Sequence, residues 1–294
     1  MILENLTTYY EFLLFYEKLL FWSIISIYSL SGILYLLFYF VPNEKISSAA
    51  TRLLRVGVIA HTAMIIFRTY EAKRAPFVSL YESLSWFAWS ALATYIYVEK
   101  KTKVKVAGFV LLLISVSACL YALIGRERDI TPLFPSLQSA WFEFHVILAF
   151  LSYAVFMVSF GVELTYVFMR RALANGRDLS KYNIEINNIE AYHNFAYNLV
   201  LFGYPLLTFG IVSGAMWANQ AWGRYWSWDP KETWSLITWV IYGMYLHAMM
   251  LPKWRGWQSS LFNILGFIGM IMTFLGVNWL AKLFGIPSIH VYAV

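Results

Sequence analysis

The chain has 294 residues, of which 60% are hydrophobic and only 13% are charged. A soluble globular domain carries roughly a quarter charged residues, so this chain has too few to cover a surface that faces water. Its hydrophobicity excludes intrinsic disorder, and its net charge of +6 comes from scattered basic residues, which excludes a nucleic-acid-binding patch. The single cysteine, Cys119, excludes a disulfide within the chain. The composition therefore predicts an integral membrane protein.

Eight nearly uncharged stretches follow one another along the chain. A membrane-spanning helix needs ~20 mostly apolar residues. Two stretches are shorter: 56–67 reaches that length if Arg55 and Arg68 snorkel to the interface, and 83–98 reaches it if the span starts near Ser79. The alternating pattern of membrane β-strands is absent. The sequence therefore predicts an all-α bundle of about eight transmembrane helices that forms a single domain over residues 1–294. The predicted spans are 19–43, 56–67, 83–98, 106–125, 144–162, 191–223, 233–252 and 256–281.

The lysines and arginines predict the orientation of this bundle. If both termini lie outside, the inner segments carry 13 of the 22 basic residues and the outer segments carry nine. Basic residues are enriched on the cytoplasmic side of membrane proteins, so we expect both termini on the outer, periplasmic or lumenal side. The membrane is then a bacterial inner membrane or, as an alternative, a thylakoid membrane.

Two histidines fall at equal depth in this topology. His61 lies six residues beyond Arg55, and His247 lies six residues before Lys253, which places both about 9 Å into the membrane from the inner side. Ionisable groups inside a bilayer are rare and usually functional, and histidine is a common axial ligand of haem iron. The pair therefore predicts a haem site within the membrane. The alternative is that each histidine packs between helices.

Two further histidines fall on the outer side. His145 lies at the outer end of the fifth predicted span, and His290 lies in the tail that follows the last span, so they form a second candidate pair. The fifth histidine, His193, begins the sixth span at the inner face, and we interpret it as an interfacial residue rather than a ligand.

The outer loop at about 217–232 is rich in tryptophan. An aromatic belt would spread tryptophans over many helix ends, whereas here they are concentrated in one loop. Flat aromatic faces and one cation suit a planar macrocycle that bears carboxylates, and Arg224 is positioned to pair with a propionate. The candidate contact residues are Trp217, Trp222, Trp226, Trp228 and Trp234.

Several segments resemble one protein family. The run WGRYWSWDPKETWSLITW is similar to the tryptophan-rich WWD signature of the CcsA family of cytochrome c biogenesis proteins, also called ResC. The segments HTAMIIFR, PFVSLYESLSW, HVILAFLSYAVF and SIHVYAV resemble further blocks of that family. The segment before Leu80 departs from the family pattern because it lacks an asparagine, and we assign it no role.

The resemblance implies the haem-handling subunit of a system II cytochrome c synthase, a thioether-forming lyase. Haem b would be bound without a covalent bond at two sites, one held by His61 and His247 in the membrane, and one held by His145 and His290 at the external loop. Attachment would occur at the external site, where Trp226, Trp228 and Asp229 complete the candidate catalytic set. As an alternative, Asp229 caps the following helix instead of contacting haem.

The resemblance also implies partners. These are a CcsB (ResB) membrane protein, an apocytochrome c with a Cys-x-x-Cys-His segment and, as a further candidate, a thiol-reducing thioredoxin-like protein. Two other functions remain open at this point. One is haem export or chaperoning without the covalent step, and the other is a transmembrane electron carrier with two b-type haems.

Overall fold

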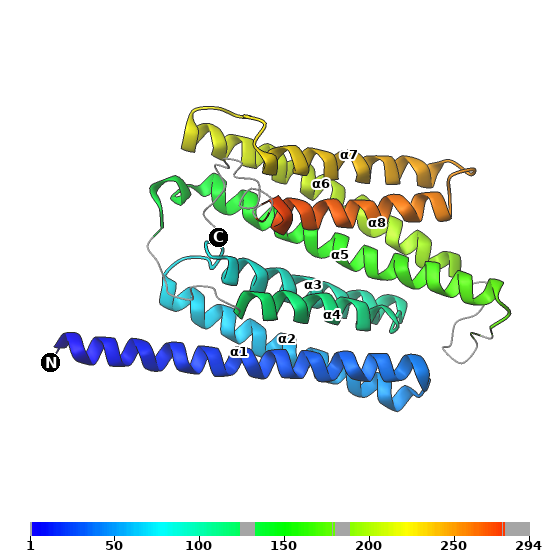
Figure 1. Ribbon diagram of the computed structural model, residues 1–294, viewed down its shortest axis with the longest axis horizontal. Coiled ribbons are helices and arrows are strands. Elements are labelled where there is room, and N and C mark those ends of the chain that lie inside the picture. The colour runs from blue at the N-terminus through cyan, green and yellow to red at the C-terminus, as the bar shows by residue number, and fades with distance from the viewer. Residues whose placement is uncertain (1, 124–132, 178, 180–188, 278, 280–294) are drawn as a thin grey trace. The chain divides into compact units, whose positions relative to one another are not determined.

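The computed structural model describes residues 2–123, 133–177, 179, 189–277 and 279. These residues form eight α-helices and no β-strand, which confirms the predicted all-α bundle (Figure 1). A short 3₁₀-helix, η1 (Pro135–Leu137), precedes α5, and a π-helical turn, η4 (Met272–Gly276), continues α8. The helices are α1 (Ile2–Phe40), α2 (Glu44–Ala72), α3 (Leu80–Thr102), α4 (Ala107–Leu123), α5 (Ala140–Ala174), α6 (Ile189–Trp222), α7 (Pro230–Met250) and α8 (Trp257–Ile271).

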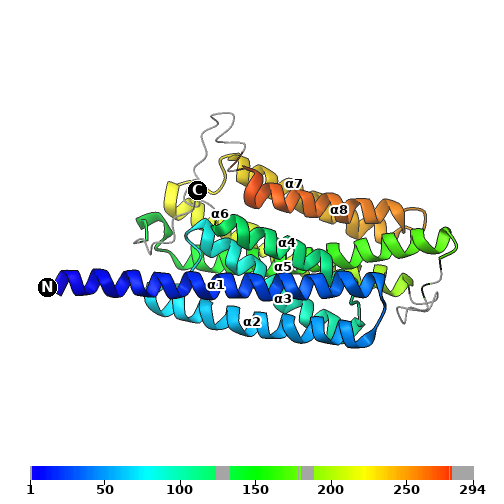
Figure 2. The ribbon, with the colours of Figure 1, turned by 60° about the horizontal axis from the view of Figure 1, so that its bottom comes forward.

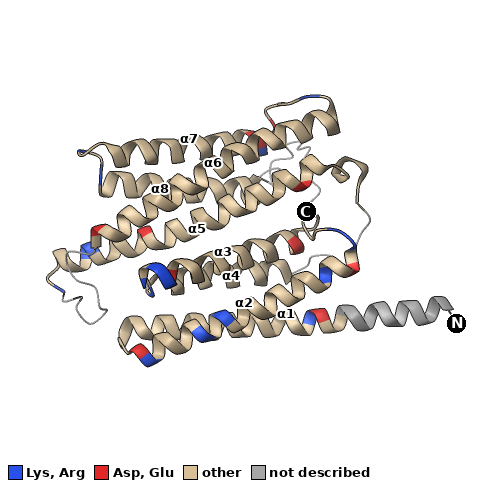
Figure 3. Cartoon of the chain, turned by 180° about the vertical axis from the view of Figure 1, so that it is seen from behind, with Lys and Arg blue, Asp and Glu red and all other residues tan. Residues whose placement is uncertain are grey.

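Five of these segments are long and apolar enough to cross a membrane, namely Phe15–Phe40, Glu44–Ala72, Ala140–Ala174, Ile189–Trp222 and Trp257–Gly276. The helix α4 is apolar but shorter, while α3 and α7 contain many serine, tyrosine and tryptophan residues that lower their hydropathy. The protein is therefore a multi-pass membrane protein. In Figure 3 the segments coloured for charged residues lie mainly near helix ends and in loops, and most of the length of the described helices is uncharged.

The chain divides into two compact units. The first comprises Met1–Ile96 and Gly108–Thr131, and the second comprises Tyr97–Ala107 and Pro132–Val294. The first unit therefore holds α1, α2 and most of α3 and α4, while the second holds α5 to α8. The single domain expected over residues 1–294 stays a prediction.

In the first unit, α1 and α2 run side by side in opposite directions (Figure 2). Gly57 permits this approach, because a Cβ atom at that position would lie 2.6 Å from a ring carbon of Tyr28. The Ser31 hydroxyl donates to the backbone oxygen of Ala50 over 2.9 Å and links the same two helices. Small residues at helix contacts are typical of membrane bundles, where close packing replaces the hydrophobic driving force.

In the second unit, α5 packs against both α6 and α8, and α7 packs against α6 and α8. Aromatic rings fill the space between these helices. Phe156 of α5 stacks on Tyr242 of α7 at 3.9 Å, and Phe160 stacks on Phe267 of α8 at 4.1 Å. Gly266 admits the Tyr242 ring, since an added Cβ would lie 2.8 Å from it. The four helices therefore share one continuous interior.

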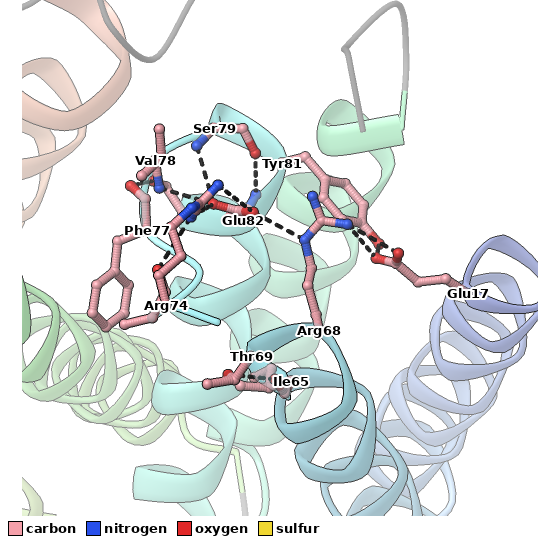
Figure 4. A network of polar contacts seen from close by, with 12 residues as sticks. Glu17, Ile65, Arg68, Thr69, Arg74, Phe77, Val78, Ser79, Tyr81 and Glu82 are labelled. Carbon is pink, nitrogen blue, oxygen red and sulfur yellow. Dashed lines mark hydrogen bonds and ion pairs between the residues drawn. The ribbon is translucent and has the colours of Figure 1, made fainter. Parts of the chain in front are cut away.

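A buried ion-pair network joins three helices of the first unit (Figure 4). The Arg68 guanidinium of α2 donates to Glu17 of α1 over 2.9 Å and to Glu82 of α3 over 3.0 Å. Arg74 donates to the same Glu82 carboxylate over 3.0 Å, and the Tyr81 hydroxyl donates to Glu17. The side chains of Arg68, Glu17 and Glu82 are at most 3% exposed. Two cations therefore balance two carboxylates in a site shielded from solvent.

The network gives a prediction for stability. Replacing Arg68 by alanine leaves Glu17 and Glu82 buried without their shared cation, and loss of one partner of a buried pair costs about 3–5 kcal/mol. We expect Arg68→Ala to lower the free energy of unfolding by that order, measured by denaturant unfolding in detergent. The matched control is Arg52→Ala, on the same helix but exposed, with an expected change within about 0.5 kcal/mol. Equal stability of the two variants would contradict this account.

Candidate functional site

His145 is held on the surface of α6 by a specific hydrogen bond. Its Nδ1 atom lies 2.7 Å from the backbone oxygen of Gly210. A carbonyl oxygen only accepts, so Nδ1 carries the hydrogen and donates it, and Nε2 is the acceptor nitrogen of the neutral ring. Donation from one ring nitrogen to a backbone carbonyl is the usual way in which a protein fixes the tautomer of a metal-binding histidine.

A second glycine one turn later provides the space for this ring. A Cβ atom on Gly214 would lie 2.8 Å from Nδ1 of His145 and 2.9 Å from its Cε1 atom. Gly210, by contrast, has room for a Cβ atom, whose nearest neighbour would be the Ala149 nitrogen at 3.6 Å. Gly214 is therefore the residue whose missing side chain permits the position of His145.

Aromatic rings continue this site toward the tryptophan-rich loop. The His145 ring is parallel to Trp217, with centroids 6.2 Å apart, and Trp217 in turn contacts Phe142 and Trp222. The indole nitrogen of Trp217 donates to the Ser136 backbone oxygen over 2.7 Å. The structure thus brings together His145, Trp217 and Trp222, three of the residues that the sequence analysis assigned to one candidate site.

The loop itself has a constrained backbone. Gly223 ends α6 with a φ of +74°, a conformation that glycine adopts without a steric penalty. Trp228 also has a positive φ, of 57°, although it is not glycine, and 68% of its side chain is exposed. Its indole meets Trp226 edge to face at 5.7 Å. Positive φ values at residues other than glycine are uncommon and concentrate at functional sites.

Asp229 caps α7. Its side chain accepts from the backbone nitrogen of Lys231 over 3.0 Å, and Glu232 reaches back to the backbone nitrogens of Asp229 and Ser227. This reciprocal arrangement is a capping box, and Pro230 at the first helical position is typical of a helix start. The structure thus supports the capping role that the sequence analysis offered as an alternative to contact with a ligand.

The remaining loop residues lie around this cap. Arg224 is exposed and forms no salt bridge within the described part of the chain. Trp234 is half-buried in the first turns of α7. Aromatic faces and one cation are therefore present on the same loop. His290 lies outside the described residues.

His61 occupies a different environment in the first unit. Its side chain is completely buried, with Nδ1 3.1 Å from the Tyr28 hydroxyl of α1 and Nε2 2.8 Å from the Ser85 hydroxyl of α3. Both ring nitrogens thus contact hydroxyl groups, and a hydroxyl can donate or accept. His247 of α7, in the second unit, is exposed on its helix.

The interpretation of His193 as an interfacial residue is wrong. Its side chain is 0% exposed, and its Nδ1 atom lies 2.7 Å from an oxygen of Glu163, which is also 0% exposed. The error arises because Glu163 precedes His193 by 30 residues and belongs to another helix, so the sequence pattern does not connect them.

The comparisons with known proteins bear directly on this site. Residues 77–284 match the family described as Cytochrome C assembly protein, and this range includes α5 to α8 with the tryptophan-rich loop. A curated cytochrome c biogenesis protein CcsA from Guillardia theta is 35% identical over 244 residues, which cover 77% of this chain and 81% of that protein. A CcsA protein from Prochlorococcus marinus (strain MIT 9303) is 30% identical over 83% of this chain and 85% of that protein.

This chain belongs to the CcsA family of cytochrome c assembly proteins. Membership assigns it a role in cytochrome c biogenesis and implies that it handles haem. A solved structure named Cytochrome c Heme Lyase CcmF has a similar fold, with a TM-score of 0.68 and 18% sequence identity. The match covers 88% of this chain but only 46% of CcmF, so the chain spans a little under half the length of that protein.

Sequence reasoning missed the two glycines that hold His145. The signal was present, because Gly210 and Gly214 are separated by three residues, a spacing typical of close helix contacts in membranes. Only the structure shows that a histidine of α5, rather than a helix backbone alone, fills the space over Gly214.

The pair of glycines gives a matched experiment. Gly214→Ala forces the His145 ring to move, and an added methyl group in a packed contact costs about 1–3 kcal/mol. Gly210→Ala meets no atom closer than 3.6 Å, and alanine is favoured over glycine within helices. We expect only Gly214→Ala to lower stability in denaturant unfolding. An equal loss of unfolding free energy in both variants would show that His145 is not tightly packed against Gly214.

Proposed function

We propose that this chain is the haem-handling subunit of a cytochrome c synthase, and that it presents haem at His145 and the tryptophan-rich loop for covalent attachment. The observation that carries the proposal is the hydrogen bond from Nδ1 of His145 to the Gly210 carbonyl. It fixes the orientation of the imidazole, as in a metal-binding histidine, and Nε2 would be the atom that binds iron, beside a group of indoles that can cover a flat ring. The family match and the CcmF-like fold support the same assignment.

The chain fits a positioning role in this reaction. Attachment adds the S–H bond of each substrate cysteine across a haem vinyl group, so that sulfur and hydrogen end on neighbouring carbons. The chain's one cysteine, Cys119, is completely buried, which supports the assignment of both thiols to the Cys-x-x-Cys-His segment of apocytochrome c. His145 would hold the iron, Arg224 would pair with a propionate, and the indoles of Trp226 and Trp228 would orient the ring.

We assign a second haem site, within the membrane, to His61 and His247. Apolar surroundings and a buried imidazole support this assignment for His61, and exposure of His247 on α7 leaves its ring available for a ligand. Ser85 contacts the Nε2 atom of His61, so its hydroxyl must give way before that nitrogen binds iron. Tyr28 would then hold Nδ1 and orient the ring.

The proposal includes a direction and a set of partners. Haem would enter from the inner side at His61 and His247 and reach the outer side at His145 and His290, with both termini and the loop outside. The membrane would be a bacterial inner membrane or a thylakoid membrane. A CcsB-type membrane protein would complete the synthase, apocytochrome c would be the substrate, and a thioredoxin-like protein would keep its thiols reduced.

The first experiment tests the external site. His145→Ala removes the proposed iron ligand, so we expect it to abolish maturation of cytochrome c while the purified protein keeps haem at the membrane site. Haem-stained cytochrome c and the pyridine haemochrome spectrum of the purified variant measure these two outcomes. His290→Ala, Trp226→Ala and Trp228→Ala should act at the same step.

Phe144→Ala is the matched control, because Phe144 is adjacent in sequence and 52% exposed. It should leave maturation unchanged. If His145→Ala and His290→Ala both mature cytochrome c at the wild-type level, the chain is not the synthase subunit, and haem export or electron transfer becomes the better assignment.

The second experiment tests the membrane site. His61→Ala and His247→Ala should each lose bound haem, and added imidazole should restore part of it by filling the vacant position on the iron. Ser85→Ala removes only the hydroxyl that occupies Nε2 of His61, so we expect it to retain haem at the wild-type level. The measurement is the amount of haem per purified chain. Normal haem content in both histidine variants would exclude this pair as ligands.

A further inference from the structure

A second group of ionisable residues lies inside the second unit, and the proposed function does not use it. Glu163 of α5 and His193 of α6 are both 0% exposed, and Nδ1 of His193 lies 2.7 Å from Oε1 of Glu163. The same Oε1 atom accepts a short hydrogen bond from the Ser260 hydroxyl of α8. Ionisable residues within membrane helices are costly, so a fully buried pair of them is a candidate functional site.

One side of this pair is connected by hydrogen bonds to the loop between α7 and α8. The Nε2 atom of His193 lies 3.2 Å from the Ser259 hydroxyl, which can donate to the Gly256 backbone oxygen over 2.9 Å. Gly256 precedes α8 and closes that loop. The Ser259 oxygen also accepts from the Gly256 backbone nitrogen over 3.0 Å. One hydrogen and one acceptor lone pair remain, so Ser259 can either donate to Nε2 or accept from it. His193 is thus satisfied whether its ring carries one proton or two.

The other side of the pair is incomplete. Among the described residues, four buried oxygen atoms on this side have no hydrogen-bond partner: Glu163 Oε2, Asn263 Oδ1, and the hydroxyls of Tyr242 and Tyr245. The Asn263 amide donates to Ser159 over 2.9 Å, and the Tyr245 hydroxyl interacts electrostatically with Glu163. An unsatisfied buried polar atom costs about 1–3 kcal/mol, so a shared partner is expected.

These atoms need a partner that both donates and accepts, and water is such a partner. One water molecule can donate to Glu163 Oε2 and Asn263 Oδ1 while it accepts from the Tyr245 hydroxyl, and buried waters make about three such bonds. These unsatisfied atoms lie farther from the α7–α8 loop than Ser259 does, since Asn263 follows Ser259 by about one turn along α8. The bonded side is therefore nearest the loop, and the unsatisfied atoms lie toward the middle of the helices.

We propose that Glu163 and His193 form a proton-binding site inside the second unit, and that the proton comes from the aqueous phase at the α7–α8 loop. A proton reaches Nε2 of His193 through the Ser259 hydroxyl, and the Nδ1 proton is shared with Oε1 of Glu163. The loaded state is a carboxylate paired with an imidazolium, so the buried site carries no net charge. On the far side of Glu163, ordered water bonds the otherwise unsatisfied oxygens of Glu163 and Asn263.

The surrounding charges agree with this site. On the loop side, Tyr166 stacks on the His193 ring at 4.4 Å. The Tyr166 hydroxyl accepts from Arg170 and donates to Glu190, and the charges of these two residues add up to zero. Arg255 in the loop contacts Asn194. From α7 the facing titratable groups are Tyr242 and Tyr245, and α8 contributes only hydroxyls and the Asn263 amide. An aromatic face over an imidazolium is itself favourable.

The test follows the ring protons of His193 by nuclear magnetic resonance. The chain has only five histidines, so ¹⁵N-histidine labelling of the full-length protein in nanodiscs without haem gives few signals, and His193→Gln assigns the one of interest. We expect the wild-type His193 ring to take up a second proton on acidification, and its protons to exchange with D₂O although the residue is fully buried. Glu163→Gln should keep the ring singly protonated over the same pH series.

Two variants separate a pathway from a static contact. Ser259→Ala breaks the link to the loop and should slow ring-proton exchange about fivefold to tenfold, the effect of one lost hydrogen bond. Glu143→Gln removes an exposed carboxylate from the same helix α5 and should change nothing. A wild-type ring that stays in one protonation state and resists exchange would overturn the proposal, even if Glu163→Gln fails to fold. None of these measurements depends on haem, so a negative result here excludes the proton-binding site without excluding the proposed function in haem handling.

Discussion

The interior of a membrane domain offers polar groups no water, and this constraint explains the main features of both units. Each buried polar side chain must find its partner within the protein or bind a ligand that supplies one. Arg68 meets the requirement with two carboxylates, and His61 meets it with two hydroxyl groups. His145 meets it with a backbone oxygen that is accessible only because α6 has no side chain at Gly214. Gly214 therefore allows close helix packing and also lets a buried polar side chain reach its hydrogen-bond partner.

Much of the fold follows from the sequence, because uncharged stretches indicate segments that lie in lipid and basic loops indicate segments that lie in water. The eight helices were predictable for this reason, and the tryptophan cluster could be read directly from the sequence. The pairing of residues from different helices was not. Nothing in the sequence connects Glu163 with His193 or His145 with Gly214, since these contacts depend on helix rotation, which a hydrophobic run does not specify. The misinterpretation of His193 has this origin.

The tryptophan-rich loop combines structural and functional residues in one short motif. Asp229, Pro230 and Glu232 form the start of α7, and Trp217 holds the region before α5 through the Ser136 oxygen. Trp226, Trp228 and Arg224 present their side chains outward or along the loop surface, where a flat ligand can meet them. The motif thus has two parts. One part starts α7 and anchors the neighbouring chain, and the other consists of side chains at the surface of the loop.

The backbone at Trp228 has a consequence for how this protein responds to selection for thermal stability. A left-handed conformation costs a residue with a Cβ atom roughly 1–2 kcal/mol, and glycine avoids that cost. A library screened only for heat resistance should therefore enrich glycine at position 228 and discard the large indole. Because Trp228 is also proposed to orient haem, a programme that stabilises this protein for structural work needs to exempt that position.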